Sequence, residues 1–420
     1  MNRKMMTAAL AGLMMAGTFA SQAMADENTI SLMLMGTEAD SFVDDYVEII
    51  NNFNETNEYG VTVNAEFYEN EQMKTKLATL MAANNAPDVF FTYELAYLEP
   101  FVNGGKVADL TDYLENDPEW KSTFSEGTLE LLEYDGRNFA IPTQISLCVM
   151  FYNKQIFADN GLEIPKTYEE FLQVCDTLKN NGVVPMAMSG ADAWIPAQFV
   201  QQLAGGMAGT DLFYGIVDGT EQWNNETHVK AAEEVVRLAE EGYFQDGYIG
   251  MTPEETTEMF LNGNAAMYFQ GTWDATTVTD RLGENGGAFV MPAYDSQYDN
   301  ISVGSLSTSF AVSEKCANKD AAVALLKYWT SLEVQEKLLY GSEKIPAINV
   351  EIQEDQLSPL MKDIIGITNE SKGMTPWWDR QFGAEEGVEF NNTCVAILGG
   401  EDAQDAFDAL QEYAEDNADR

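Results

Sequence analysis

The chain has little of what catalytic and metal-binding sites are usually built from. Its 420 residues include one histidine and four cysteines. The histidine, His228, lies near the start of an expected helix, so a His-dependent triad has one candidate at an unsuitable place, and we expect it at the surface. The cysteines are far apart and form no C-x-x-C pair, which argues against a zinc cluster. They are Cys148, Cys175, Cys316 and Cys394. We expect no metal site and no cofactor, and we assign no disulfide.

Short enzyme motifs are also absent from the sequence. There is no Gly-x-Ser-x-Gly elbow, no His-Glu-x-x-His zinc motif and no phosphate-cradling Gly-Lys-Ser loop. These absences argue against the commonest hydrolases and nucleotide-binding enzymes, and no catalytic residue is assigned.

Basic residues are scarce. The chain has 22 Lys and Arg against 69 Asp and Glu, which gives a formal net charge of −47. Such a surface repels phosphates, so nucleic acid and anionic membranes are excluded as partners. The acidity is typical of a soluble protein in a salty exterior. The alternative is attraction of a cationic ligand, although physiological salt confines such a field to roughly 8 Å.

The one long apolar run lies at the N-terminus and is typical of a secretory signal peptide. Two basic residues precede an apolar stretch at 5–20, and a small-x-small cleavage site ends at Ala25. The run is too short for a good membrane span. We therefore expect residues 1–25 to be removed on export, leaving Asp26 as the first mature residue.

The expected mature chain is free of a lipid anchor. No cysteine precedes Cys148, so the sequence has no lipobox. We expect a freely soluble periplasmic or extracellular protein. Removing the signal takes two positive charges from −47, which leaves about −49 on 395 residues, that is 420 minus 25. This length is too great for one ordinary hydrophobic core and favours two lobes.

Strand and helix patterns alternate in the first part of the mature chain. Apolar strands are expected at 29–35, 61–67 and 88–92, with helical spacing of apolar residues at 42–53 and 73–81. Strand, helix, strand, helix, strand predicts a parallel sheet covered by helices.

The alternation continues to the end of the chain. Further strands are expected at 147–152, 185–188, 265–269, 289–291 and 302–312. Further helices are expected at 167–180, 195–204, 227–241, 254–262, 319–332 and 401–418.

Several segments, in this order and spacing, resemble one known family. They lie at 87–91, 135–142, 151–154, 165–171, 260–268, 271–274, 309–313 and 345–347. The chain resembles extracellular solute-binding protein family 1, the maltose-binding-protein-like proteins that deliver sugars to ABC importers. The resemblance covers nearly all of the expected mature chain.

The resemblance implies a two-lobed α/β fold of the periplasmic-binding-protein type. Each lobe would be a mostly parallel sheet flanked by helices, and the lobes would close about a hinge. The three expected chain crossings lie near 141–144, 290–293 and 329–331. The expected N-lobe is 26–141 plus 292–330, and the expected C-lobe is 142–291 plus 331–420.

Tryptophans that follow strands are candidates to line the cleft between the lobes. Flat indole rings cover the apolar face of a sugar, and the family places aromatic residues at such positions. Trp194 precedes an expected helix, Trp273 follows the strand at 265–269, and Trp377 and Trp378 are adjacent. We expect Trp273, Trp194 and Trp378 to face the cleft.

Polar residues near strand ends complete the expected site. Carboxylates and amides bind pairs of sugar hydroxyls. Arg380 is also placed to brace Asp379. The polar candidates are Glu38, Tyr93, Glu94, Gln144, Asp274, Asp379 and Arg380.

The resemblance implies the substrate-binding component of an ABC importer. It would be a non-enzymatic and monomeric protein that captures a sugar or oligosaccharide by hinge closure and delivers it to permease subunits. A binder of a cationic solute such as a polyamine is the alternative. A secreted glycoside hydrolase with two carboxylates is a further one.

Overall fold

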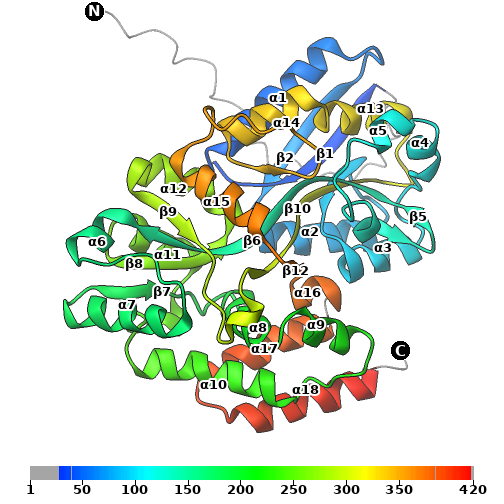
Figure 1. Cartoon of the computed structure of the whole chain (residues 1–420). Helices are drawn as coiled ribbons and strands as arrows, with labels where there is room; N and C mark the ends of the chain where they lie inside the picture. Colours follow the sequence, from blue (N-terminus) through cyan, green and yellow to red (C-terminus); the bar gives the residue numbers. More distant parts are fainter. Residues whose placement is uncertain (1–27, 39, 384, 418–420) are drawn as a thin grey trace, which may run out of the picture.

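The computed structural model describes residues 28–417 except 39 and 384. The expected signal peptide and its cleavage site lie outside the described residues. Figure 1 shows two bodies of helices and strands, one above the other, with strands running between them.

The first body begins with the predicted alternation. Strand β1 (Thr29–Met35) pairs in parallel with β2 (Thr62–Tyr68) and β3 (Val89–Thr92). Helices α1 (Phe42–Thr56) and α2 (Asn70–Ala82) connect these strands. These predictions are confirmed. β3 is a continuous apolar run that is buried throughout, whereas β2, at the edge of the sheet, alternates apolar and polar residues.

Short elements follow β3. They are η1 (Leu95–Tyr97), α3 (Glu99–Asn103), α4 (Thr111–Glu115), α5 (Pro118–Lys121), η2 (Glu130–Leu132), β4 (Glu133–Tyr134) and β5 (Arg137–Asn138).

Two long strands join the two bodies. Strand β6 (Ala140–Asn153) is antiparallel to β10 (Ile301–Val312), and the sheet order is β2-β1-β3-β10-β6-β8-β7. β6 is longer than the predicted strand at 147–152, because Thr143 and Gln144, expected at a crossing, are buried within the strand. The sheet is therefore mixed: its outer pairs are parallel, while the pairs of β10 with β3 and β6, and of β6 with β8, are antiparallel.

The second body packs helices on both faces of its strands. Strands β7 (Val184–Ala187) and β8 (Ala265–Gly271) are parallel, and β9 (Gly286–Phe289) pairs with β6. The remaining helices and strands of the described residues are α6 (Lys154–Asp159), α7 (Tyr168–Asn180), α8 (Trp194–Ala208), α9 (Thr210–Val217), α10 (Glu226–Glu240), η3 (Tyr248–Gly250), α11 (Pro253–Leu261), η4 (Thr272–Asp274), α12 (Ala275–Leu282), η5 (Gly283–Asn285), η6 (Ser296–Tyr298), α13 (Lys319–Trp329), α14 (Leu332–Gly341), β11 (Ile345–Pro346), α15 (Pro359–Glu370), β12 (Gly373–Thr375), α16 (Trp378–Gln381), α17 (Glu386–Leu398) and α18 (Ala403–Asn417).

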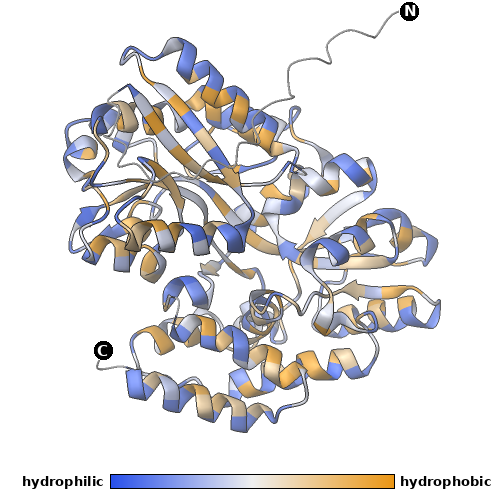
Figure 2. Ribbon diagram, turned by 180° about the vertical axis from the view of Figure 1, so that it is seen from behind, coloured by the Kyte–Doolittle hydropathy of each residue, from blue (hydrophilic) through white to orange (hydrophobic). Residues whose placement is uncertain are grey.

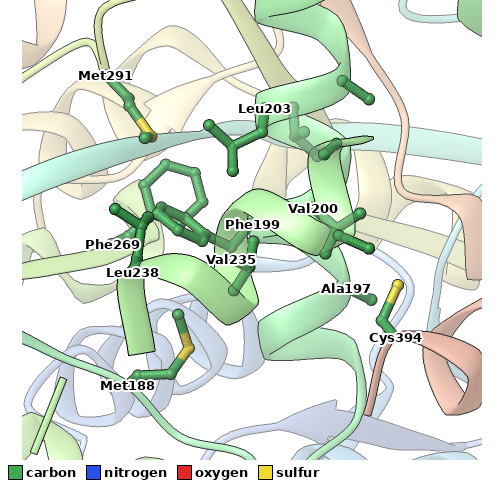
Figure 3. Packing of buried hydrophobic residues seen from close by; sticks show 14 of the residues in the cluster. Met188, Ala197, Phe199, Val200, Leu203, Val235, Leu238, Phe269, Met291 and Cys394 are labelled. Carbon is green, nitrogen blue, oxygen red and sulfur yellow. The ribbon is translucent and has the colours of Figure 1, made fainter. Parts of the chain in front are cut away.

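The hydrophobic residues form separate cores in the two bodies. We call N-lobe the part whose core surrounds β1, β2 and β3, and C-lobe the part whose cores surround β7 and β8. In Figure 2 the hydrophobic residues lie on the strands and on the inner sides of the helices of both lobes. Figure 3 shows part of the C-lobe core, where Phe199 and Leu203 of α8 pack beside Phe269 of β8 and Leu238 of α10. The two-lobed α/β fold is confirmed.

The cores divide the chain differently from the predicted crossings. Val303 belongs to the C-lobe core and Leu306 to the N-lobe core, so the division falls inside β10 rather than at 290–293. Val334 and Leu338 of α14, expected in the C-lobe, belong to the N-lobe core. The physical reason is that β10 runs through both lobes as one strand, and that α14 packs on α1.

The expectation that His228 lies at the surface is wrong, because its side chain is buried. It is 1% exposed and lies among Trp223, Phe390 and Phe407 of the C-lobe core. Its Nδ1 atom is 3.1 Å from the carbonyl oxygen of Trp223. Burial lowers the pKa of His228 to about 4, so the ring is neutral at neutral pH.

Among the described helices, none combines the length and the apolar character that crossing a bilayer requires.

Candidate functional site

A cavity of about 160 Å³ lies between the lobes, many times the volume that one water molecule needs. Its N-lobe side is formed at the ends of β1 and β3 and by α2. Its C-lobe side is formed by the start of α8, the turn after β8, and the start of α16. Loops at strand ends and helix starts are where ligands bind in open α/β sheets. The lining residues are Met35, Asn70, Lys74, Tyr93, Trp194, Trp273, Ser307, Trp377, Asp379 and Arg380.

Three indole rings form one side of the cavity. The ring centroids of Trp194 and Trp273 are 5.9 Å apart with an interplanar angle of 64°. Those of Trp273 and Trp377 are 5.5 Å apart at 44°. We call Trp194, Trp273 and Trp377 the indole wall. Because the rings are tilted toward one another, the wall is curved rather than a flat platform.

We predicted that Trp378 would face the cleft, but the structure places Trp377 there instead. Trp378 is 2% exposed and stacks on Phe213 in the C-lobe core, with centroids 4.3 Å apart at 19°. Trp377 lines the cavity and donates its Nε1 hydrogen to Gln198 at 3.0 Å. The helix α16 begins between the two residues, and this change of backbone direction sends their side chains to different sides.

Arg380 lies between the two lobes. The centre of its guanidinium group is 4.1 Å from the ring centroid of Tyr93 in the N-lobe and 4.1 Å from that of Trp377 in the C-lobe. Its Nη1 group donates to the carbonyl oxygen of Leu306 in β10. The stacked rings and the carbonyl fix the plane of the guanidinium group at the edge of the cavity.

Glu94 lies behind Arg380 and does not line the cavity. Its side chain is fully buried, and one carboxylate oxygen is 3.5 Å from Nη1 of Arg380. Within the described part of the chain, neither oxygen of Glu94 accepts a hydrogen bond. The predicted brace between Arg380 and Asp379 is therefore replaced by a pair between Arg380 and Glu94.

A second pair of opposite charges faces across the cavity. Burial lowers the pKa of Lys74, but the negative charges of Asp379 and Glu71 outweigh it and leave that pKa raised. Nζ of Lys74 is 2.9 Å from a carboxylate oxygen of Glu71. Lys74 belongs to α2 of the N-lobe and Asp379 to α16 of the C-lobe. The cavity thus has charged and polar groups opposite the indole wall.

Three further predicted site residues, besides Trp378 and Glu94, do not line the cavity. Glu38 is exposed in the loop after β1 and does not line the cavity. Gln144 is buried in β6, and its amide oxygen accepts hydrogen bonds from Tyr46 at 3.2 Å and from Thr308 at 3.0 Å. These bonds connect β6 to α1 and β10, so the oxygen is already occupied.

Asp274, the third of these residues, does not line the cavity. It accepts a hydrogen bond of 3.2 Å from the hydroxyl group of Tyr268. Burial raises the pKa of Asp274 to about 6, although Tyr268 and Lys344 act in the opposite direction.

Four lining residues were not predicted. Asn70 and Lys74 are four positions apart and share one face of α2, directly after β2, so the rule that sites follow strands could have found Asn70. Met35 is the last residue of β1. Ser307 lies at an irregularity in the pairing of β10 with β6, and the sequence gives no signal for that bulge.

Comparison with known protein families gives one match. The model of the bacterial extracellular solute-binding proteins matches residues 39–336, which is well over half of the chain. The chain belongs to this family. The resemblance predicted from the sequence is confirmed.

Curated relatives of this solute-binding protein are distant. An uncharacterized ABC transporter extracellular-binding protein of Pyrococcus horikoshii is 24% identical over 302 residues, covering 70% of this chain and 65% of that protein. The multiple sugar-binding protein of Streptococcus mutans is 22% identical over 231 residues, covering 53% of this chain and 54% of that protein. The match therefore spans less than two thirds of either relative.

Solved structures of the same kind cover the chain more fully. A chitin oligosaccharide binding protein has a TM-score of 0.83 at 26% identity, covering 91% of this chain and 98% of that chain. A protein from a study of xylan utilization by Caldanaerobius polysaccharolyticus has a TM-score of 0.85 at 25% identity, covering 91% of this chain and 99% of that chain.

Proposed function

We propose that this solute-binding protein is the substrate-binding component of an ABC importer and that it captures a neutral sugar in the cavity between its lobes. The observation that carries the proposal is the indole wall of Trp194, Trp273 and Trp377 facing polar groups across a small interlobe cavity. A pyranose ring has an apolar face for the indoles and a rim of hydroxyls for Asn70, Asp379 and Arg380. The names of the relatives, which include sugar-binding proteins, support the same class of ligand.

A cationic solute is the weaker candidate. Of the charged residues that line the cavity, Lys74 and Arg380 are positive and Asp379 alone is negative. Glu38 and Asp274, two of the carboxylates predicted for the site, do not line it. A polyamine would therefore meet one lining carboxylate beside two lining cations, which is a poor match for several positive charges.

Capture without catalysis is part of the proposal. Hydrolysis of a glycosidic bond ordinarily needs two carboxyl groups on opposite sides of that bond. Among the described residues that line the cavity, Asp379 is the one carboxylate. The protein would bind the sugar, close on it and release it unchanged.

The remaining parts of the proposal concern place and partners. We propose export by the N-terminal signal, a free monomer outside the cytoplasmic membrane, and delivery of sugar to the transmembrane subunits of a permease. No cofactor takes part in this cycle.

Titration calorimetry with a panel of sugars tests the proposal. The panel contains galactose, xylobiose, diacetylchitobiose, raffinose and stachyose, with spermidine as the cationic competitor. We expect saturable heat with at least one sugar, none with spermidine, and unchanged sugar on product analysis. Heat with spermidine alone would favour the cationic class, and released monosaccharide would show a hydrolase.

A further inference from the structure

The residue Arg380 is held by groups from three parts of the fold. Helix α16 packs on α17 of the C-lobe, yet it also contacts η1 of the N-lobe. Tyr93 and Glu94 come from the N-lobe, Trp377 from the C-lobe, and the carbonyl of Leu306 from the strand that joins the lobes. All of these contacts are present together in this structure, and together they bridge the two lobes.

Arg380 is the partner that balances the negative charge of Glu94 in the N-lobe. Glu94 is fully buried, and among the described residues no hydrogen bond reaches its carboxylate oxygens. A buried carboxylate without a positive partner is costly, because it has lost its hydration. Arg380 is the group that forms an ion pair with it, and the two residues belong to different lobes.

The backbone beside this ion pair is also closely packed. A Cβ atom built on Gly383, just after α16, would lie 3.1 Å from the carbonyl oxygen of Ala96 in η1. Gly383 also has a φ of +75°, which favours glycine. The close approach of α16 to η1 is thus possible because residue 383 has no side chain.

We propose that Glu94 and Arg380 form an interlobe latch: an ion pair that stabilises the closed state and holds the Arg380 guanidinium in the orientation that faces the ligand. Glu94 is then a positioning residue that acts through Arg380 and does not touch the ligand. The inference deepens the proposed function and rests on it for the role of the sugar. The effect on closure itself requires no ligand.

The latch gives Asp379 and Arg380, which are adjacent on α16, different roles. Asp379 is opposite Lys74 at the cavity, where a ligand can reach it. Arg380 has one edge engaged by Glu94 and Leu306, and the rest of the guanidinium group borders the cavity. When the lobes separate, water can reach Glu94 and Arg380, so opening removes the penalty that a broken pair would carry in the closed state.

Fluorescence energy transfer between the lobes tests the latch. Dyes are attached at Glu119→Cys in α5 of the N-lobe and Gln404→Cys in α18 of the C-lobe, two exposed positions. The four native cysteines are all buried, so they do not compete for the dyes. The closed fraction is measured by single-molecule transfer in ligand-free protein, first in the wild type and then in Glu94→Gln.

We expect a closed population in the ligand-free wild type and a ratio of closed to open molecules at least about tenfold lower in Glu94→Gln. Glu94→Asp retains the charge and should recover part of that ratio. The matched control is Glu234→Gln, which removes a Glu–Arg ion pair within α10 of the C-lobe and should leave the ratio unchanged. An unchanged ratio in Glu94→Gln, or a wild type without a closed population, would overturn the latch.

A second measurement separates the latch from the proposed function. The sugar of the panel above that binds most tightly is titrated into Glu94→Gln, Arg380→Gln and the double variant. If the pair acts as a unit, the double variant binds no more weakly than Arg380→Gln alone, whereas additive losses contradict the latch. If no panel sugar binds but the ligand-free ratio falls as expected, the latch stands and the proposed function fails.

Discussion

The Nζ atom of Lys344 donates a hydrogen bond of 2.9 Å to the carbonyl oxygen of Trp273. The same atom lies 4.1 Å from the ring centroid of Phe42, at the start of α1 in the N-lobe. A buried lysine thus connects the N-lobe to the residue in the middle of the indole wall. It lies in the segment before β11, which pairs with the interlobe strand β6.

The pH dependence of stability should report Lys344. Burial lowers its pKa from 10.5 to about 8, against the attraction of Asp274, Asp40 and Glu343. The folded protein therefore binds fewer protons than the unfolded chain between these values, so this group makes stability rise as the pH increases from about 8 towards 10.5.

The test compares the wild type with Lys344→Met by urea unfolding. The difference in free energy of unfolding between the wild type and the variant should increase by about 2 kcal/mol from pH 8 to pH 10, in favour of the wild type. This value follows from the linkage between protonation and folding. A difference that does not change with pH would show that Lys344 titrates normally in the folded protein.

Acid should destabilise the protein through His228. Burial lowers the pKa of this ring from 6.5 to about 4, so the unfolded chain binds more protons between these values and stability is lost as the pH falls through them. The variant His228→Gln, which has no group that titrates there, should lose about 3 kcal/mol less than the wild type between pH 7 and pH 4. Parallel losses in chemical unfolding would contradict this assignment.

The two neighbouring tryptophans should respond differently to truncation. Trp377→Ala removes part of the indole wall and should weaken sugar binding by at least about 1 kcal/mol, from the lost contact with the sugar ring. Trp378→Ala opens a hole in the C-lobe core and should lower the free energy of unfolding by about 3 to 5 kcal/mol. Calorimetry and urea unfolding distinguish them. Equal effects on affinity at equal stability would argue against the placement of the wall.

Asp379 should matter more for binding than for folding. Asp379→Asn removes a charged acceptor at the cavity and should weaken sugar binding by about 2 kcal/mol, the usual loss for a hydrogen bond to a charged group. The control is Glu38→Gln, at an exposed residue outside the cavity, which should bind as the wild type does. Calorimetry on both variants provides the comparison, and a weakened Glu38→Gln would move the site.

The sequence predicts strands better than it predicts the directions of single side chains. Apolar runs such as Thr29–Met35 form the expected strands, because burial on both faces of a sheet demands such runs. The turn after Pro376 carries no such periodicity. Which of Trp377 and Trp378 reaches the cavity depends on where α16 begins, and tertiary packing decides that.

The burial of single polar side chains is also hard to predict from the sequence. His228 and Glu94 are polar residues that a pattern assigns to the surface or to a ligand, yet both are buried. Their partners, Trp223 for the one and Arg380 for the other, are near in sequence in the first case and 286 positions away in the second. The long-range pairing between lobes has no local signal.

The most direct measurement is a crystal structure with the panel sugar that binds most tightly. The account predicts one sugar ring against Trp273 in the cavity between the lobes, with hydroxyl groups within hydrogen-bond distance of Asp379 or Arg380. A sugar bound elsewhere on the protein, with the indole rings of Trp194, Trp273 and Trp377 free of contact, would contradict it.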